Sequence, residues 1–118
     1  MDQIDFEELV NEAVREVPKD FLKYLENVQI TTAMWPNLNQ RQFAKGALLL
    51  GLYEGIPKTK RGLNYTMVLP DKITIFQGSI ELIAKTPEEM KKQVQKTVIH
   101  EIAHHFGISD KRLRQIGV

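Results

Sequence analysis

The sequence predicts an α+β fold with a pair of N-terminal helices, a small mixed sheet of three or four strands, a long helix and a short C-terminal helix. Three observations support this prediction. Apolar residues recur at three- and four-residue steps in residues 6–17, β-branched residues alternate with polar ones in residues 28–32, and a capping sequence precedes a long helical pattern at residues 87–106. With 118 residues, the chain is expected to form one domain, residues 1–118, with a core of its own.

The composition narrows the class of protein. The sequence contains no cysteine, so it can form neither a disulfide framework nor a cysteine-ligated zinc site. The first residues are acidic, and no apolar run is long enough for a signal peptide or a membrane span. These features predict a soluble, cytoplasmic protein that does not bind a membrane. The excess of basic residues in residues 28–118 is compatible with a nucleic-acid or acidic partner. These residues are scattered, however, so a solvated surface is the preferred interpretation and a nucleic-acid partner is not expected.

The N-terminal helix is expected to begin at a capping box formed by Asp5 and Glu8 and to end at Pro18. Its apolar stripe is best explained as the side that faces the core, which is the usual role of such a stripe. A second short helix should follow and end at Asn27. The side chains that it directs inward are expected to be Phe21, Leu22 and Leu25.

The first strand is predicted at residues 28–32, and Trp35 and Pro36 are expected to end it. Residues 37–45 are polar and should form a loop or one exposed helical turn. The apolar run at residues 47–53 is nearly continuous, as is typical of a strand that is buried on both faces. It therefore predicts the central strand of the sheet.

A mobile basic connection and a return strand at residues 63–69 are expected next, followed by a turn at Pro70. A further strand is predicted at residues 73–76. The stretch from residue 73 to Gln77 is the candidate edge strand to which an extended peptide could add through backbone hydrogen bonds. A short helix is expected at residues 79–84.

The long helix is predicted to begin after Thr86, an N-cap residue that is followed by Pro87 at the first helical position. It should continue to Phe106, and a short C-terminal helix should start at about Lys111. The first half of the long helix is amphipathic, whereas the second half is apolar almost all round except for a few ionisable residues. Ionisable groups in such surroundings need a partner, and a metal ion is one.

All the histidines of the chain lie at the end of this helix. His100 and His104 are one helical turn apart, so their side chains leave the same face and suit two ligands of one metal ion. Glu101 completes the His-Glu-x-x-His arrangement, in which two imidazoles hold zinc and the glutamate is the general base. Gly107 favours a left-handed helix end that returns the chain toward the metal, and Asp110 follows at the spacing of the third metzincin ligand. Asp110 is therefore the predicted third ligand.

Three other residues could contribute to the site without binding the metal. His105 lies about 140° round the helix from His100, so it is expected to pack or to support the ligands rather than to bind the metal. Tyr53 and Tyr65 are candidates for an oxyanion donor, although a packed core tyrosine whose hydroxyl has a partner is the preferred interpretation of each.

The motif resembles that of the small bacterial zincin-like metallopeptidases, or minimal zincins, which carry His-Glu-x-x-His-x-x-Gly-x-x-Asp. The resemblance extends over segments at residues 51–57, 69–76 and 98–113, of which the last is the specific one. Gln77 departs from the family pattern, which often has arginine at this place. The resemblance implies a zinc-dependent peptidase fold. It also implies that the zinc ligands are His100, His104 and Asp110 and that the general base is Glu101.

The expected function is hydrolysis of peptide bonds by a zinc-activated water with Glu101 as general base, so the expected partners are one zinc ion and a peptide or protein substrate. Two alternatives remain open. A zinc hydrolase acting on nucleic acid would use the same chemistry, and the basic residues 58–61 support it. A non-catalytic zinc-containing module that binds a peptide or partner would not need Glu101, and the chain offers no further histidine or cysteine to close a structural site.

Overall fold

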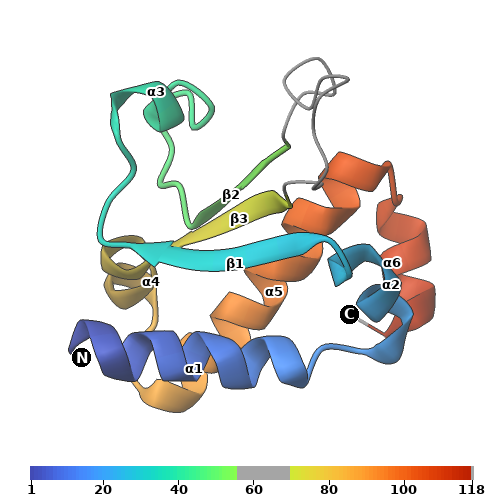
Figure 1. The fold of residues 1–118 in the computed structure, drawn as a ribbon, viewed down its shortest axis with the longest axis horizontal. Coiled ribbons are helices and arrows are strands. Elements are labelled where there is room, and N and C mark those ends of the chain that lie inside the picture. Colours follow the sequence, from blue (N-terminus) through green and yellow to red (C-terminus); the bar gives the residue numbers. More distant parts are fainter. Residues whose placement is uncertain (56–69, 118) are drawn as a thin grey trace, which may run out of the picture.

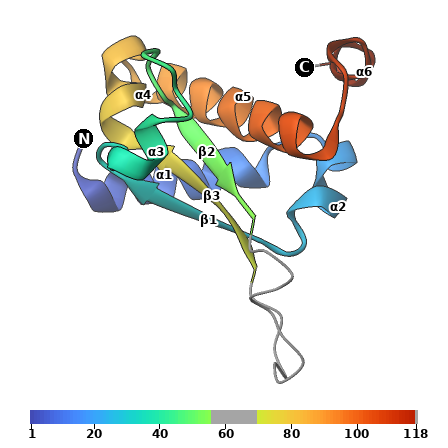
Figure 2. The ribbon, with the colours of Figure 1, turned by 90° about the horizontal axis from the view of Figure 1, so that it is seen from above.

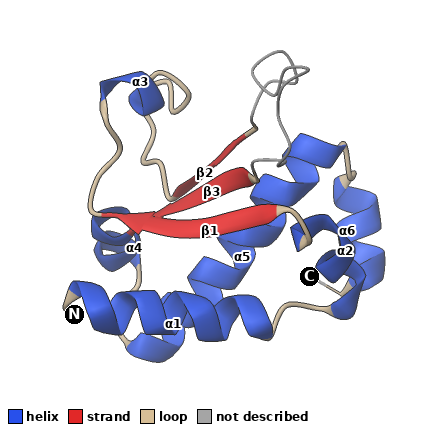
Figure 3. Cartoon of the chain, in the orientation of Figure 1, coloured by secondary structure: helices blue, strands red, loops and turns tan. Residues whose placement is uncertain are grey.

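The computed structural model describes residues 1–55 and 70–117, in which the strands form one mixed sheet with helices packed against it (Figure 1). β1 (Val28–Ala33) runs parallel to β3 (Asp71–Phe76), and β3 pairs antiparallel with β2 (Gly51–Glu54). The strand order in this part of the chain is β1-β3-β2, so β3 is central and β2 lies at an edge. Figure 3 shows the helices and strands in this α+β arrangement, which confirms the predicted fold class.

This strand order corrects two predictions. The apolar run at residues 47–53 is not the central strand, because only its last part enters the sheet and it does so at the edge. Its apolar character comes partly from residues 48–50, which precede β2 and line a groove.

The candidate edge strand at residues 73–77 was also wrong. Residues 73–76 are buried and hydrogen-bonded to strands on both sides, and Gln77 already belongs to the following helix. An added peptide could not reach this backbone. The predicted basic connection and the return strand at residues 63–69 lie outside the described residues.

The N-terminal helix, α1 (Gln3–Arg15), begins two residues before the predicted capping box. Asp2 is its N-cap, and the Asp2 side chain accepts a hydrogen bond of 2.8 Å from the backbone N–H of Asp5. The apolar stripe faces inward as predicted, with Phe6, Val10 and Ala13 buried. The helix position was therefore predicted correctly from the stripe, whereas its first residue depended on which aspartate provides the cap.

The second helical segment consists of a 3₁₀ turn, η1 (Lys19–Phe21), and a short helix, α2 (Leu22–Leu25). Phe21 is fully buried, as predicted, but Leu22 is 47% exposed. The prediction for Leu22 failed because a 3₁₀ turn has three residues per turn, which changes the direction of the side chains that follow it.

The remaining helices follow the predicted order. α3 (Leu38–Arg41) is the exposed turn expected in residues 37–45, and α4 (Gln77–Ile83) starts directly after β3. α5 (Pro87–Phe106) is capped by Thr86, whose hydroxyl accepts from the N–H of Glu89 at 3.1 Å. α6 (Asp110–Ile116) is the short C-terminal helix.

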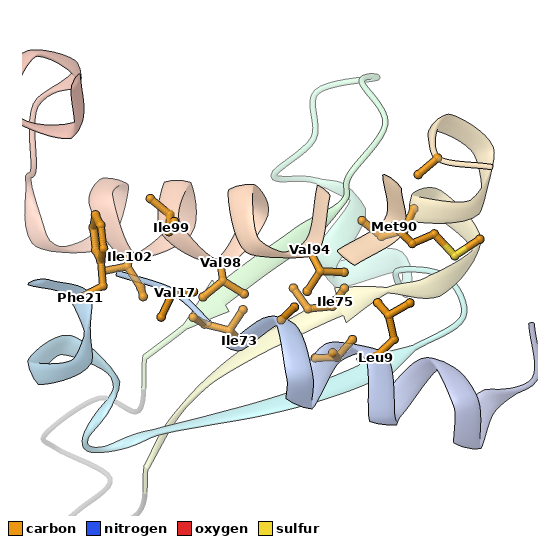
Figure 4. Close-up of a cluster of buried hydrophobic side chains, with 14 of the residues drawn as sticks. Leu9, Val17, Phe21, Ile73, Ile75, Met90, Val94, Val98, Ile99 and Ile102 are labelled. Carbon is orange, nitrogen blue, oxygen red and sulfur yellow. The ribbon is translucent and has the colours of Figure 1, made fainter. Parts of the chain in front are cut away.

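The core lies between the sheet and the helices α1 and α5. Figure 4 shows Val94 and Val98 of α5 facing Ile73 and Ile75 of β3, with Leu9 of α1 beside them. In Figure 2, β2 is the strand of the sheet on the side of α5, and the hydrogen bond from Tyr53 to Glu101 joins β2 to the C-terminal half of this helix. The core thus fixes the long helix against the edge of the sheet. Over residues 1–55 and 70–117, no helix is both long and apolar enough to cross a membrane.

The edge strand packs against α5 at Gly51. A Cβ atom added there would lie 2.7 Å from Cγ2 of Thr97 and 3.2 Å from both Cδ1 of Ile75 and the carbonyl oxygen of Thr74. Gly51 therefore allows the strand to contact the helix.

We expect Gly51→Ala to lower the free energy of unfolding by about 1–3 kcal/mol, because the added methyl group overpacks this contact. Thr97→Ser removes Cγ2 but keeps the hydroxyl that accepts from Gln93, so the double variant should recover part of the loss. Urea unfolding of the wild type, both single variants and the double variant measures this coupling. An equal loss from Gly51→Ala with threonine or serine at position 97 would contradict the close contact.

Candidate metal centre

The C-terminal half of α5 presents two histidines on one face. The ring centroids of His100 and His104 are 6.5 Å apart and the ring planes are inclined by 67°. His100 is half-buried, whereas the side chain of His104 is 76% exposed. Both imidazoles leave the same side of the helix, as predicted from their spacing, and this arrangement suits two ligands of one ion.

Glu101 connects this helix to the edge of the sheet. Its Oε1 accepts a 2.9 Å hydrogen bond from the backbone N–H of Tyr53 in β2, and its Oε2 lies 3.9 Å from Nδ1 of His104. Burial raises the pKa of Glu101 above the usual carboxyl value of 4.5, while the Tyr53 hydrogen bond and the nearby histidines act in the opposite direction. A half-buried carboxylate with a raised pKa beside two imidazoles is typical of a site that transfers protons.

The N–H of Tyr53 points away from the sheet because of the pairing of β2. The N–H of Phe76 donates to the carbonyl of Leu50, so residues 50 and 52 bond to β3 and the alternate residues face outward. The outward groups in β2 belong to Gly51 and Tyr53, next to α5. Glu101 accepts from the last of these.

His105 packs against the same strand instead of joining the other histidines. Its ring stacks on that of Tyr53 with a centroid separation of 3.9 Å and an angle of 16°. The Tyr53 hydroxyl donates to Oδ2 of Asp71 at 2.7 Å, so this tyrosine is a packed residue with a satisfied hydroxyl, as preferred from the sequence. Tyr65 lies outside the described residues.

Gly107 ends α5 in the left-handed conformation, with φ of 71° and a hydrogen bond of 2.8 Å from the N–H of Ile108 to the carbonyl of Ala103. The chain reverses as predicted, and Asp110 becomes the first residue of α6. Asp110 is exposed there. Within the described ranges, no three histidine, cysteine or acidic side chains come together closely enough to hold a metal ion. The structure thus brings His100, Glu101 and His104 together but does not bring Asp110 into contact with them.

The donor types fit a zinc ion, because imidazole and carboxylate are both accepted zinc ligands and two imidazoles already share one face. Glu101 is suited to a different role. It lies on the side of the helix that faces β2, and one of its oxygens is already bonded to the backbone of that strand.

A groove of about 480 Å³ opens beside His100 and Glu101. Its volume lies within the range of about 300–1,000 Å³ that is usual for ligand sites. Residues 48–51 form one wall, and Ile83 contributes from α4. The remaining lining residues lie on one face of α5: Gln93, Lys96, Thr97, His100 and Glu101.

Sequence reasoning missed this groove. It assigned residues 47–53 to a central strand and did not consider α5 residues N-terminal to His100 as part of the site. One signal was present, because Gln93, Lys96, Thr97 and His100 are spaced by three and four residues and therefore share a helix face with the motif.

A comparison with protein families identifies the family that the sequence resembles. Residues 25–118 match the model of a family described as zincin-like metallopeptidase. A solved structure of a conserved hypothetical protein from Thermus thermophilus is 28% identical, with a TM-score of 0.57 over 90% of this chain and 94% of that one. Among proteins of curated function, none matches.

In the metal-free protein, we expect Glu101→Gln to raise the free energy of unfolding at pH 7. The pKa of Glu101 is raised on folding, so the folded protein binds this proton more tightly than the unfolded chain, and ionisation of Glu101 lowers stability above the folded pKa. The glutamine oxygen can still accept from Tyr53. The gain should shrink as the pH falls through the folded pKa and disappear below 4.5.

Urea unfolding in the presence of a chelator measures this effect at pH 7 and below pH 4.5. Glu8→Gln is the matched control, because it removes the same charge at an exposed position on α1. A lower stability of Glu101→Gln than of wild type at pH 7 would show that burial does not penalise this carboxylate.

Proposed function

The chain belongs to the zincin-like metallopeptidase family, and we propose that it hydrolyses peptide bonds in a zinc-dependent reaction with Glu101 as general base. The observation that carries this proposal is the position of Glu101. Its carboxylate lies between the two-histidine face of α5 and the edge strand, next to the groove, and one oxygen is oriented by the backbone of Tyr53. A structural zinc site would not require such a group.

The proposed zinc ligands are His100, His104 and Asp110. Zinc in such a site supplies a Lewis acid for the scissile carbonyl and a water that ionises near neutral pH. Asp110 makes no hydrogen bond or ion pair with any described residue, so its side chain can turn toward the imidazoles without losing a partner. The chain reverses its direction at Gly107, and only two residues separate this glycine from Asp110. Asp110 therefore stays near the end of α5, and a small rotation of its side chain is proposed to bring it to the metal.

Glu101 performs the proton transfers in this proposal. The Tyr53 N–H holds Oε1 and thereby directs Oε2 toward the histidine face. Oε2 accepts a proton from the attacking water and then delivers it to the leaving amine of the substrate. The raised pKa of Glu101 suits both steps, because the carboxylate is more basic than an exposed one.

The substrate backbone is proposed to bind along β2 and the residues before it. The backbone groups of Gly51 face away from β3, and residues 48–50 continue the wall of the groove before it. An extended peptide can pair with them as an additional strand, which supplies affinity without depending on side-chain identity. Gly51 keeps this edge close to α5, so a peptide bound there lies beside Glu101.

We expect His100→Ala and His104→Ala each to abolish stoichiometric zinc binding, because each removes one of the paired imidazoles. His105→Ala is the matched control and should retain the ion, since His105 stacks on Tyr53. Plasma emission analysis of the purified proteins measures zinc per chain. Loss of zinc from His105→Ala together with retention in His104→Ala would refute the assignment of ligands.

Two further variants separate the base from the ligands. Glu101→Gln should retain zinc but lose hydrolysis by about 10²–10⁴-fold, the usual contribution of a positioned proton acceptor. Asp110→Ala should lose zinc affinity, activity and the stabilisation that zinc gives to the fold, because metal binding is linked to folding.

The assay uses unstructured peptides and short single-stranded oligonucleotides with the zinc-loaded proteins, and metal content is measured in parallel. Cleavage of oligonucleotides alone would favour a nuclease. If wild type cleaves nothing and Glu101→Gln has every measured property of wild type, the chain is a zinc-containing binding module and the peptidase proposal is wrong.

A further inference from the structure

The groove beside Glu101 has one strongly apolar wall. Leu48 is 47% exposed and Ile83 is 50% exposed, and the half-buried Leu49 and Leu50 complete this side. Large aliphatic side chains that stay exposed around a concave surface are typical of a ligand-binding site. The proposed hydrolysis does not itself require an apolar wall, so the wall is available for selecting the substrate.

The opposite side of the groove carries a positive charge. Lys96 is exposed on α5 and makes no ion pair or hydrogen bond within the described part of the chain. Lys91 of the same helix, in contrast, lies 2.7 Å from a carboxylate oxygen of Glu16. Among the described residues that line the groove, only Glu101 is acidic, and the proposed mechanism employs it at the reacting bond.

The geometry of α5 determines how far Lys96 lies from the proposed metal ligand His100 along the helix axis. Lys96 precedes His100 by four residues, which is about 6 Å along the helix axis. An extended peptide advances about 3.3 Å per residue, so this distance corresponds to about two residues of bound substrate. The distance along the helix from Lys96 to His100 is therefore short enough for one extended peptide segment to span.

We propose that this groove selects peptides that carry a large apolar side chain near the scissile bond and a carboxylate about two residues away, with Lys96 binding that carboxylate. This inference rests on the proposed peptidase function and names its substrate class. The leucine wall and Ile83 take up the apolar side chain, while Lys96 is a specificity-determining residue that does not contact the reacting atoms. The carboxylate comes either from an acidic side chain or from the C-terminus of the peptide.

Binding is measured separately from cleavage, with zinc-loaded Glu101→Gln protein and fluorescent peptides in an anisotropy titration. The first pair of peptides presents leucine and, two residues later, glutamate or glutamine within an alanine-rich sequence that is amidated at its end. A second pair ends two residues after the leucine, either as a free carboxylate or as an amide. We expect the carboxylate peptide of at least one pair to bind roughly 3- to 10-fold more tightly, as is usual for a partly exposed charged contact.

Charge reversal tests the role of Lys96. Lys96→Glu in the same background should abolish the preference for a carboxylate and favour a peptide with lysine at that place. Lys92→Glu is the matched control, because it makes the same change at an exposed position of α5 that does not line the groove. Circular dichroism melting curves verify that both variants fold.

The outcomes distinguish this inference from the proposed function. Equal affinities within both peptide pairs, or equal effects of Lys92→Glu and Lys96→Glu, overturn the role of Lys96, even if wild type cleaves peptides. Selective binding that depends on Lys96, together with no cleavage by zinc-loaded wild type, supports the selecting groove and overturns the peptidase proposal instead.

Discussion

The hydrogen bond from the backbone N–H of Tyr53 to Glu101 joins the helix that carries the candidate ligands to the edge of the sheet. One end of the bond belongs to the strand along which a peptide is proposed to bind, and the other end belongs to the proposed base. The same strand also carries the ring on which His105 stacks. The position of the base relative to a bound substrate therefore depends on how closely β2 packs against α5, which in turn depends on the absence of a side chain at Gly51.

Much of the helical structure could be predicted from the sequence because its signals are local. Thr86 and Pro87 mark the start of α5, and Gly107 marks its end with a left-handed residue. The spacing of His100 and His104 then determines their common face without any knowledge of the sheet. The errors among the helices have local causes as well. Asp2 and Asp5 are both able to cap α1, and the 3₁₀ turn before Leu22 altered a pattern that assumed 3.6 residues per turn.

The sheet could not be predicted to the same extent, because strand order is a non-local property. Residues 47–53 are as apolar as a central strand, but for two different reasons. Residues 48–50 line the open groove, whereas residues 51–53 belong to the edge strand that packs against α5. The strand that is central is β3, and its place became apparent only from its pairing with both neighbours. The contact between Glu101 and Tyr53 was hidden for the same reason, since 48 residues separate the partners.

The proposed binding and reactive groups lie along a single helix, at positions 93, 96, 97, 100, 101 and 104. An α-helix has a fixed rise per residue, so the distances between these side chains along the helix axis cannot change independently of one another. Inserting one residue between positions 96 and 100 would rotate residues 93 and 96 by about 100° round the helix axis relative to His100. Their side chains would then no longer face the groove, although none of them had been replaced. Replacing the side chain at position 93 or 96, in contrast, leaves the other side chains of this face in their positions. Divergence among related chains is therefore expected to proceed by substitution along α5, with insertions confined to the loops around it.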